Sequence, residues 1–319
     1  MPVQREPAPN TVPGCPLPAV VANPSNVNDV ARLRTQITGV CRELGWADPL
    51  WLETTVEDPG GGQAKAALAA GADVVLACGG DGTVREVAQI LAGSGTAMGL
   101  LPTGTANLLA RNLAIPLDNT TRATRIALSG NTRQIDVGWV TFDQGEEHVF
   151  LVMAGMGFDA AIMAGAHHHS KTRLGSLAYF ISGVRAGVRG LSKQRVRIVL
   201  AVDGRPELHR QVRTVVVGNC GKLLAGLVLM PGAKIDDGLL DVVTIAPKGL
   251  LGWMGVTARV LSRRPSGHRI VQHWQGGTVT IIAEEPEQAQ LDGDPVGEVQ
   301  MLRMRADEGA LLVRVRGSR

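Results

Sequence analysis

The sequence has few cysteines, a small excess of one charge and no long apolar run. Its four cysteines, at positions 15, 41, 78 and 220, lack the spacing of metal ligands, and we predict reduced thiols of a cytosolic protein. The net charge of +3 argues against a general nucleic-acid binder. No apolar run reaches the ~18 residues that span a bilayer, and the start of the chain does not resemble a secretory signal. We therefore expect a cytoplasmic protein, and its 319 residues favour two domains.

The stretch from Val74 to Thr83 is an apolar run that ends in three glycines, one carboxylate and one hydroxyl. It predicts a buried strand, a tight turn and then a helix from about Val84. Glycines permit positive φ and leave no Cβ in the way, so backbone N–H groups and the helix N-terminus can approach a phosphate closely. A carboxylate beside phosphates is tolerable mainly with a cation between them, so Asp81 indicates Mg²⁺. The alternative is a plain glycine turn with a surface aspartate.

The first part of the chain alternates short apolar strands with helices, and polar or glycine-rich loops follow each strand. A mobile tail is expected over residues 1–16. The expected strands are 18–22, 51–55, 73–78 and 97–101, and the expected helices are 27–44, 63–70, 84–91, a helix ending at 112, and 120–129. We expect the turn 23–26 to cap the first helix. These units predict a parallel sheet with a nucleotide at the carboxyl ends of its strands, and a domain boundary near residue 132.

The remainder of the chain consists of alternating segments typical of an antiparallel β-sandwich or barrel. The expected strands include 134–141, 148–154, 195–202, 211–219, 240–245 and 277–283. Residues 155–160 fit the dinucleotide fingerprint G-x-G-x-x-A. The acidic residue expected about 20 positions later is missing, because no Asp or Glu lies between Asp159 and Asp203. We therefore disfavour a dinucleotide site.

The same acid-free window carries lysines and arginines from Lys171 to Arg197 around an apolar helical stretch. Such a segment suits an anionic membrane surface, at ~1 kcal/mol per cation near it. An equally weighted alternative is a helix that packs on the sandwich with a solvated cationic face. His167, His168 and His169 are consecutive and lack the i, i+4 placement of metal ligands, so a polar loop is favoured over a metal site.

Several motifs together resemble the family of bacterial soluble diacylglycerol kinases and lipid kinases, which is related to sphingosine kinases. They are Asn23-Pro24-Ser25, Gly79-Gly80-Asp81-Gly82-Thr83, Leu101 to Arg111, Gly155 to Ala160, Ile235 to Asp241, and Leu291-Asp292-Gly293-Asp294. The glycine loop alone is shared with NAD kinases. The resemblance implies an α/β nucleotide-binding domain over 17–132, completed by 308–319. It also implies a lipid-binding β-sandwich over 133–307, with the active site in the cleft between the two domains.

The resemblance also assigns roles to residues. ATP would contact Asn23, Pro24, Ser25, Asn26, Thr54 or Thr55, Gly79, Gly80, Asp81, Gly82, Thr83, Gly104 and Thr105. A second, structural Mg²⁺ would be held by Asp237 with the carbonyls of Lys234 and Leu239, which are the hard oxygen ligands that Mg²⁺ prefers. The catalytic base would lie in Asp292-Gly293-Asp294, where the family has Asp-Gly-Glu. Either the shorter Asp294 lies closer to the acceptor hydroxyl, or Asp292 takes more of the role; the Asp-Gly pair also predicts a hairpin turn.

We therefore predict a kinase that uses ATP and Mg²⁺ and phosphorylates a lipid hydroxyl, with Asp81, Asp292 and Asp294 as catalytic residues. Diacylglycerol is the expected acceptor. We expect peripheral association with the inner face of the membrane and no nucleic-acid partner, and the prediction allows a homodimer. One alternative is a kinase of NAD or another soluble acceptor. The other is a non-catalytic nucleotide-binding protein of the same fold.

Overall fold

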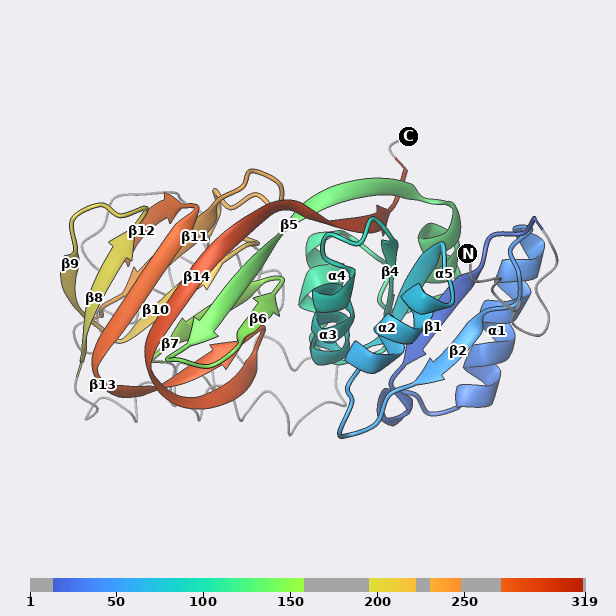
Figure 1. Cartoon of the computed structure of the whole chain (residues 1–319), viewed down its shortest axis with the longest axis horizontal. Coiled ribbons are helices and arrows are strands. Elements are labelled where there is room, and N and C mark those ends of the chain that lie inside the picture. Colours follow the sequence, from blue (N-terminus) through green and yellow to red (C-terminus); the bar gives the residue numbers. More distant parts are fainter. Residues whose placement is uncertain (1–13, 158–194, 222–229, 248–270, 318–319) are drawn as a thin grey trace, which may run out of the picture. The chain divides into compact units, whose positions relative to one another are not determined.

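The computed structural model describes residues 14–157, 195–221, 230–247 and 271–317 (Figure 1). Most of the expected tail, the histidine run and most of the cationic window from Lys171 to Arg197 lie outside these residues. The chain divides into two compact units. Unit 1 is the chain up to Ile135 together with the chain from Ala310 onward, and unit 2 runs from Asp136 to Gly309.

Unit 1 contains a parallel sheet with the strand order β2-β1-β3-β4. Its strands are β1 (Pro18–Ala22), β2 (Leu50–Glu53), β3 (Val74–Gly79) and β4 (Ala97–Pro102). Every residue of β1 and β3 is buried, which accounts for their continuous apolar sequences, because central parallel strands are covered on both faces. The last part of β14 (Asp294–Val315) extends this sheet, where Val313 pairs in parallel with Met98 of β4.

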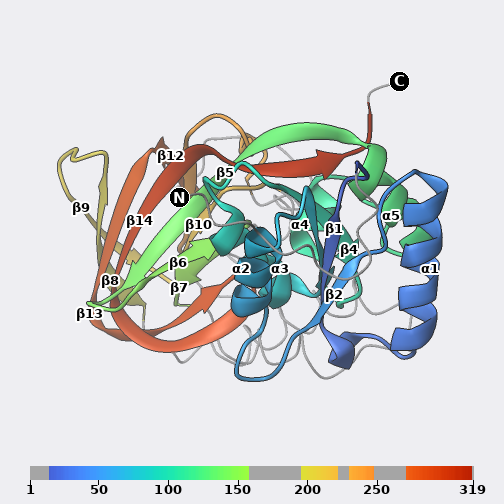
Figure 2. The same cartoon turned by 45° about the vertical axis from the view of Figure 1, so that its right-hand side comes forward.

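Helices cover the sheet of unit 1 in two pairs. The helices are η1 (Pro24–Asn26), α1 (Val30–Glu43), α2 (Gly61–Ala69), α3 (Asp81–Leu91), α4 (Leu108–Asn112) and α5 (Thr120–Ser129). Contacts join α1 to α5 and α2 to α3, and Figure 2 shows the two pairs on opposite sides of the strands. The α5 helix packs so closely on β4 that a Cβ on Gly99 would lie 2.5 Å from Cβ of Ala127.

The prediction that residues 23–26 cap the first long helix is wrong. The side chain of Asn23 accepts a hydrogen bond from the N–H of Ser25 and caps the short helix η1 instead. The long helix α1 begins later, where the side chain of Asp29 accepts from the N–H of Arg32 at 2.8 Å. An oxygen acceptor at a helix start satisfies an N–H group that has no acceptor within the helix. Asn23 therefore marks the start of η1, and Asp29 marks the start of α1.

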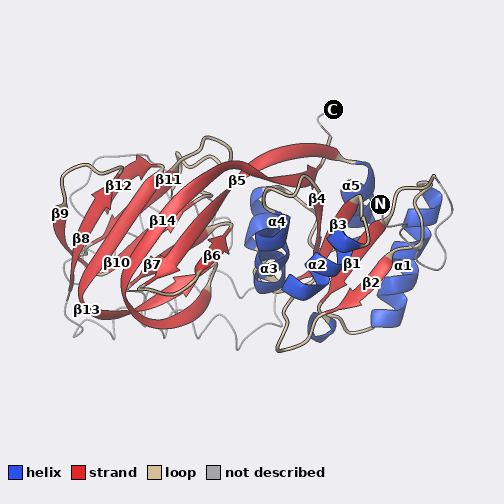
Figure 3. Ribbon diagram, viewed as in Figure 1, coloured by secondary structure: helices blue, strands red, loops and turns tan. Residues whose placement is uncertain are grey.

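Unit 2 is built from antiparallel strands (Figure 3). They are β5 (Asn131–Phe142), which begins in unit 1, β6 (Glu147–Phe150), β7 (Met153–Met156), β8 (Val196–Val202), β9 (Leu208–Val212), β10 (Thr214–Gly218), β11 (Leu240–Ile245), β12 (Val271–Gly276), β13 (Thr278–Leu291) and most of β14. The main order is β12-β11-β10-β7-β13-β14. The long strand β13 pairs with β8 near its start and with β7 near its end, on either side of a register shift after Ile282.

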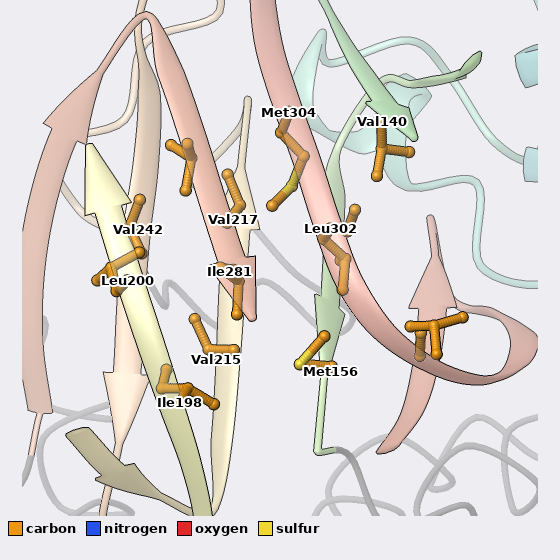
Figure 4. Close-up of a cluster of buried hydrophobic side chains, with 14 of the residues drawn as sticks. Val140, Met156, Ile198, Leu200, Val215, Val217, Val242, Ile281, Leu302 and Met304 are labelled. Atoms are coloured by element: carbon orange, nitrogen blue, oxygen red, sulfur yellow. The ribbon is translucent and has the colours of Figure 1, made fainter. Parts of the chain in front are cut away.

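The core of unit 2 lies between these strands (Figure 4). Leu200 of β8, Val215 of β10 and Ile281 of β13 are all completely buried there. Burying one such side chain contributes about 1.5–3 kcal/mol, so this core supplies much of the driving force for folding of the unit. The arrangement confirms the predicted fold class, a parallel α/β part followed by an antiparallel β-sandwich.

Two expected strands of unit 2 are each broken into two. The segment 148–154 forms β6 and β7, because the N–H groups of residues 151–153 donate to the carboxylate of Asp292 rather than to a strand. The segment 211–219 forms β9 and β10, which separate at Arg213: β9 pairs with β8, whereas β10 pairs with β7 and β11. Gly155, the first glycine of the apparent dinucleotide fingerprint, lies inside β7 and pairs with Val216 and Gln290 on either side.

All four cysteines are free thiols. Burial raises the pKa of the Cys41 thiol to about 11 and that of the Cys78 thiol to about 12, so both remain protonated near neutral pH. Among the described helices, none combines the length and the apolar character needed to cross a membrane.

Candidate functional site

The predicted nucleotide-binding residues of unit 1 come together at the carboxyl edge of its sheet. Asn23 follows β1 and donates its N–H to the carbonyl of Cys78 in β3 at 2.8 Å. Thr54 follows β2 and donates its N–H to the carbonyl of Ala22 at 2.9 Å. The chain leaves the central strands β1 and β3 toward opposite neighbours, β2 and β4. Ligands of open α/β sheets bind at such a reversal of strand order, so this edge is the candidate site.

The glycine loop depends on close packing rather than on unusual backbone angles. Gly79 ends β3, Gly80 caps α3 with a φ of −89°, and α3 begins at Asp81. Gly79, Gly80 and Gly82 all have ordinary negative or extended φ values, so the predicted use of positive φ is not what requires them. A Cβ on Gly79 would instead lie 2.6 Å from Cβ of Thr83, which is itself buried in the first turn of α3.

The loop that follows β4 approaches the glycine loop equally closely. A Cβ on Gly104 would lie 2.4 Å from Cα of Gly80. The N–H groups of Thr103 and Gly104 both donate to the carbonyl of Gly79, at 3.1 and 3.2 Å. The two loops are therefore in backbone contact, and glycine is required where they meet.

Side-chain hydrogen bonds join these loops further. The Asn23 amide donates to the hydroxyl of Thr83 at 3.4 Å, and the Asn26 amide nitrogen lies 3.5 Å from the place of a Cβ on Gly80. Asn107, a residue that the sequence prediction missed as a site residue, adopts a left-handed conformation with φ of 48° and donates to the carbonyl of Gly104 at 2.7 Å. Asparagine tolerates the left-handed conformation better than most residues. An asparagine directly before a predicted helix was therefore the signal in the sequence that could have identified Asn107.

Asp81 lies in the first turn of α3, and its Oδ1 accepts a hydrogen bond from the N–H of Leu108 at 2.6 Å. The carboxylate therefore connects the glycine loop to the start of α4. Within the described ranges, no group of three His, Cys, Asp or Glu side chains could hold a metal ion. Mg²⁺ needs no such group beside a nucleotide, because it is usually held by one or two carboxylates, phosphate oxygens and water. Asp81 fits that role.

The remaining residues of unit 1 that were predicted to contact ATP differ in their exposure and in their hydrogen bonds. The hydroxyl of Thr55 accepts from the N–H of Asp58 at 3.1 Å and so serves its own turn, whereas Thr54 is buried at the end of β2. Pro24, Ser25 and Thr105 are exposed or partly exposed at the same edge. The first turn of α3 adds backbone N–H groups and the positive end of a helix of 11 residues, which favour an anion.

In unit 2, Asp292 and Gly293 form the two-residue turn of the β13–β14 hairpin. Both have positive φ, 49° and 98°, and Leu291 pairs with Asp294 across the turn. Positive φ at both central residues is typical of the turn that Asp-Gly favours, so the predicted hairpin is present. Asp292 is 4% exposed, and its carboxylate accepts three backbone hydrogen bonds, from Leu151, Val152 and Met153, at 2.8 to 2.9 Å. Asp294 follows the turn and is partly exposed.

The predicted second metal site lies in the turn before β11. The Oδ1 of Asp237 accepts from the N–H of Leu239 at 3.2 Å, and the buried carboxylate of Asp136 accepts from Gly238 at 2.7 Å and from Gly309 at 2.8 Å. Asp136 thus fixes this turn, a role that the sequence prediction missed.

A second carboxylate lies close to Asp237. Asp241 is 5% exposed, and its Oδ2 has no hydrogen-bond partner in the part of the chain that the structure describes. Burial raises the pKa of this carboxyl and the charge of Asp237 raises it further, against an opposing hydrogen bond with Gln275. A buried carboxylate oxygen without a hydrogen-bond partner among the described residues, near the charge of Asp237, fits a hard divalent cation, so these carboxylates suit the expected Mg²⁺.

Two arginines of the cationic window are described, and both have partners within unit 2. Arg195 donates to the carbonyl of Pro247 at 3.2 Å, and Arg197 forms an exposed ion pair with Glu284 at 3.1 Å. These contacts account for the two arginines without a membrane surface.

Comparison with known proteins gives matches to both units. Residues 19–140 match the diacylglycerol kinase catalytic domain, and residues 152–314 match the YegS C-terminal NAD kinase beta sandwich-like domain. A YegS-like lipid kinase of Pseudomonas aeruginosa is 35% identical over 256 residues, which cover 77% of this chain and 78% of that protein.

A diacylglycerol kinase of Mycobacterium tuberculosis is also 35% identical, but over 177 residues, so the alignment covers 56% of this chain and 56% of that relative's length. A crystal structure of a diacylglycerol kinase from Bacillus anthracis superposes with a TM-score of 0.68 at 19% identity, and covers 94% of this chain and 97% of that one. At that identity the similarity shows the shared fold.

Proposed function

The chain belongs to the lipid kinase family of the bacterial diacylglycerol kinases and YegS-like proteins, and from this premise we propose that it transfers the γ-phosphoryl group of ATP to a lipid hydroxyl. Diacylglycerol is the proposed acceptor and phosphatidic acid the product. The observation that carries the proposal is the contact of the glycine loop with the loop after β4, where a Cβ on Gly104 would lie 2.4 Å from Cα of Gly80. Such backbone-lined edges suit phosphate groups.

The proposed phosphate cradle consists of Gly79 to Thr83 with the N-terminus of α3. Asn23 to Asn26, Thr54, Gly104 and Thr105 would complete the ATP contacts around it. Phosphoryl transfer requires little covalent chemistry from the protein, so positioning and charge stabilisation supply most of the catalysis. Loops held by several backbone hydrogen bonds meet that requirement.

Two carboxylate sites are proposed for Mg²⁺. Asp81 would hold the ion that accompanies the nucleotide, and Asp237, the carbonyls of Lys234 and Leu239 and the neighbouring Asp241 would hold a structural one. When bound with ATP, Mg²⁺ neutralises negative charge on the phosphoryl oxygens.

Asp294 is the proposed general base. Its carboxylate would accept the proton of the lipid hydroxyl while that oxygen bonds to the γ-phosphorus and the bond from this phosphorus to the oxygen of ADP breaks. A partly exposed carboxylate at a strand start is accessible to an acceptor from solvent or from a membrane surface. Because diacylglycerol resides in bilayers, we also propose peripheral membrane association. The proposal includes a homodimer as well. The assay below depends on neither membrane association nor dimerisation.

The test is incubation of the purified protein with labelled ATP, Mg²⁺ and separate acceptors in mixed micelles, followed by identification of the product. The acceptors are diacylglycerol, a glycerophospholipid, a sphingoid base and, without lipid, NAD. We expect labelled phosphatidic acid from diacylglycerol. The variant Asp294→Asn should reduce the rate by ~10²–10⁴, the usual contribution of a general base.

The same assay separates the alternatives. Phosphorylation of NAD without lipid would favour a soluble kinase. Binding of ATP without transfer to any acceptor would favour a non-catalytic nucleotide-binding protein. A folded Asp294→Asn variant with near-normal turnover would refute its assignment as the base.

A further inference from the structure

The hairpin that carries Asp294 is held by several hydrogen bonds at its turn. Besides its carboxylate contacts to residues 151–153, Asp292 donates its own N–H to the carbonyl of Met153 at 2.8 Å. The next residue, Gly293, donates its N–H to Oε1 of Gln290 at 2.8 Å, and Gln290 is 1% exposed. Both residues of the turn are therefore held by hydrogen bonds from their backbone N–H groups.

Both oxygens of the Asp292 carboxylate accept backbone hydrogen bonds. Its Oδ2 accepts from Leu151, and its Oδ1 accepts from both Val152 and Met153. The Asp-Gly turn alone does not require this, because asparagine tolerates the same left-handed conformation. The carboxylate instead serves the N–H groups of residues 151–153, which lie at the break between β6 and β7 and donate to Asp292 rather than to a neighbouring strand.

A general base must come within about 2.6–3.2 Å of the proton that it removes. Asp292 is only 4% exposed, so to do so its carboxylate would have to release the N–H groups of Leu151 and Val152, which would then be buried without acceptors. Asp294 differs from Asp292, because it is partly exposed and directly follows the fixed turn. The two aspartates of the motif thus have different environments.

We propose that Asp292 is a positioning residue, which fixes the hairpin against the backbone of residues 151–153, and that Asp294 alone accepts the proton. This inference rests on the proposed function. It also bears on the aspartate at the position where the family has a glutamate: a side chain shorter by one methylene has less reach, so its placement depends more strongly on a rigid turn.

The test compares Asp292→Asn, Asp292→Glu and Asp294→Asn with a matched control, Glu298→Gln, an exposed acid-to-amide change on the same hairpin. The measurements are kcat, KM for ATP, the pH profile of kcat, and amide hydrogen exchange of residues 151–153. A base that must be deprotonated produces a fall of kcat at low pH, and a residue that only positions the base does not remove this fall.

We expect Asp294→Asn to lower kcat by ~10²–10⁴ and to abolish the fall at low pH, with normal amide exchange. Both Asp292 variants should lower kcat by about 10-fold or more, because the base is displaced. They should leave KM for ATP and the low-pH fall unchanged, and should accelerate exchange of residues 151–153. Glu298→Gln should match the wild type in every measurement.

The inference is overturned if Asp294→Asn keeps the low-pH fall of kcat, a result that decides the question even if the buried Asp292 variants do not fold. It is also overturned if Asp292→Asn folds with accelerated amide exchange but normal kcat. A wild-type protein that transfers no phosphoryl group to any acceptor would overturn the proposed function itself, together with this inference.

Discussion

The substitution Gly104→Ala tests whether backbone contact between two loops builds the phosphate site. The added Cβ would lie 2.4 Å from Cα of Gly80, whereas ordinary van der Waals contact begins at 3.4 Å. Because the clash is with backbone, no side-chain rotation relieves it, and the loops must separate by about 1 Å. A displacement of that size costs about 10²-fold in catalysis. Overpacking of this kind also costs about 1–3 kcal/mol of unfolding free energy.

Two further glycines provide controls. A Cβ on Gly80 would lie 3.5 Å from the Asn26 amide nitrogen and 3.6 Å from Cα of Gly104, which are ordinary contacts, so Gly80→Ala should fold with near-normal stability. Any loss of ATP affinity in that variant would then report exclusion of phosphate by the methyl group. A Cβ on Gly39, inside α1, meets nothing within 4 Å, so Gly39→Ala should stabilise by about 0.5–1 kcal/mol and leave kinase activity unchanged.

The assay combines urea unfolding with calorimetric titration of Mg·ATP and measurement of kcat/KM. We expect Gly104→Ala to lose at least about 10²-fold in kcat/KM while it remains folded in the absence of denaturant. Normal ATP affinity and normal kcat/KM in folded Gly104→Ala would refute the argument that this contact shapes the site.

Two other predictions concern charge. Asp241 is buried near the charge of Asp237, and one of its oxygens has no hydrogen-bond partner among the described residues. Asp241→Asn should therefore raise the unfolding temperature in EDTA, by about 2–4 °C for each kcal/mol of relieved repulsion, and should abolish stabilisation by Mg²⁺. The exposed control Asp236→Asn should keep the stabilisation by Mg²⁺. Stabilisation by Mg²⁺ that persists in Asp241→Asn would contradict its role as a ligand. If the segment from Lys171 to Arg197 binds membranes, affinity for anionic vesicles should fall with salt and by about five-fold per charge when Lys171 and Arg173 are changed to Glu. Binding that is insensitive to salt would contradict the electrostatic mechanism.

The parallel-sheet part of the fold was accessible from sequence because its signals are local. The run before Gly79 identified a buried strand, and the spacing of apolar residues identified the helix after it. Helix α5 was predicted with the bounds that the structure gives, Thr120–Ser129. The error in unit 1 arose because two polar side chains near the first long helix could each cap it. Asn23 caps the short helix η1, and Asp29 caps the long helix α1.

The β-sandwich was less accessible because its strand ends are set by partners far along the chain. Nothing near residues 151–153 announces a break, since all three are apolar, and the break exists because Asp292 accepts their N–H groups from about 140 positions away. Asp136 was missed for the same reason, because it accepts from Gly238 and from Gly309.

The sequence by itself determined the order of strands and helices, the glycine loop and the set of carboxylates, because these depend on near neighbours and residue chemistry. Only the tertiary structure decided what each of these groups does. It requires glycine at 79 and 104 for contact rather than for positive φ, and it separates Asp292 from Asp294 by burial. Hydrogen bonds and van der Waals contacts act over a few ångströms, so residues distant in sequence acquire their roles only when folding brings them together.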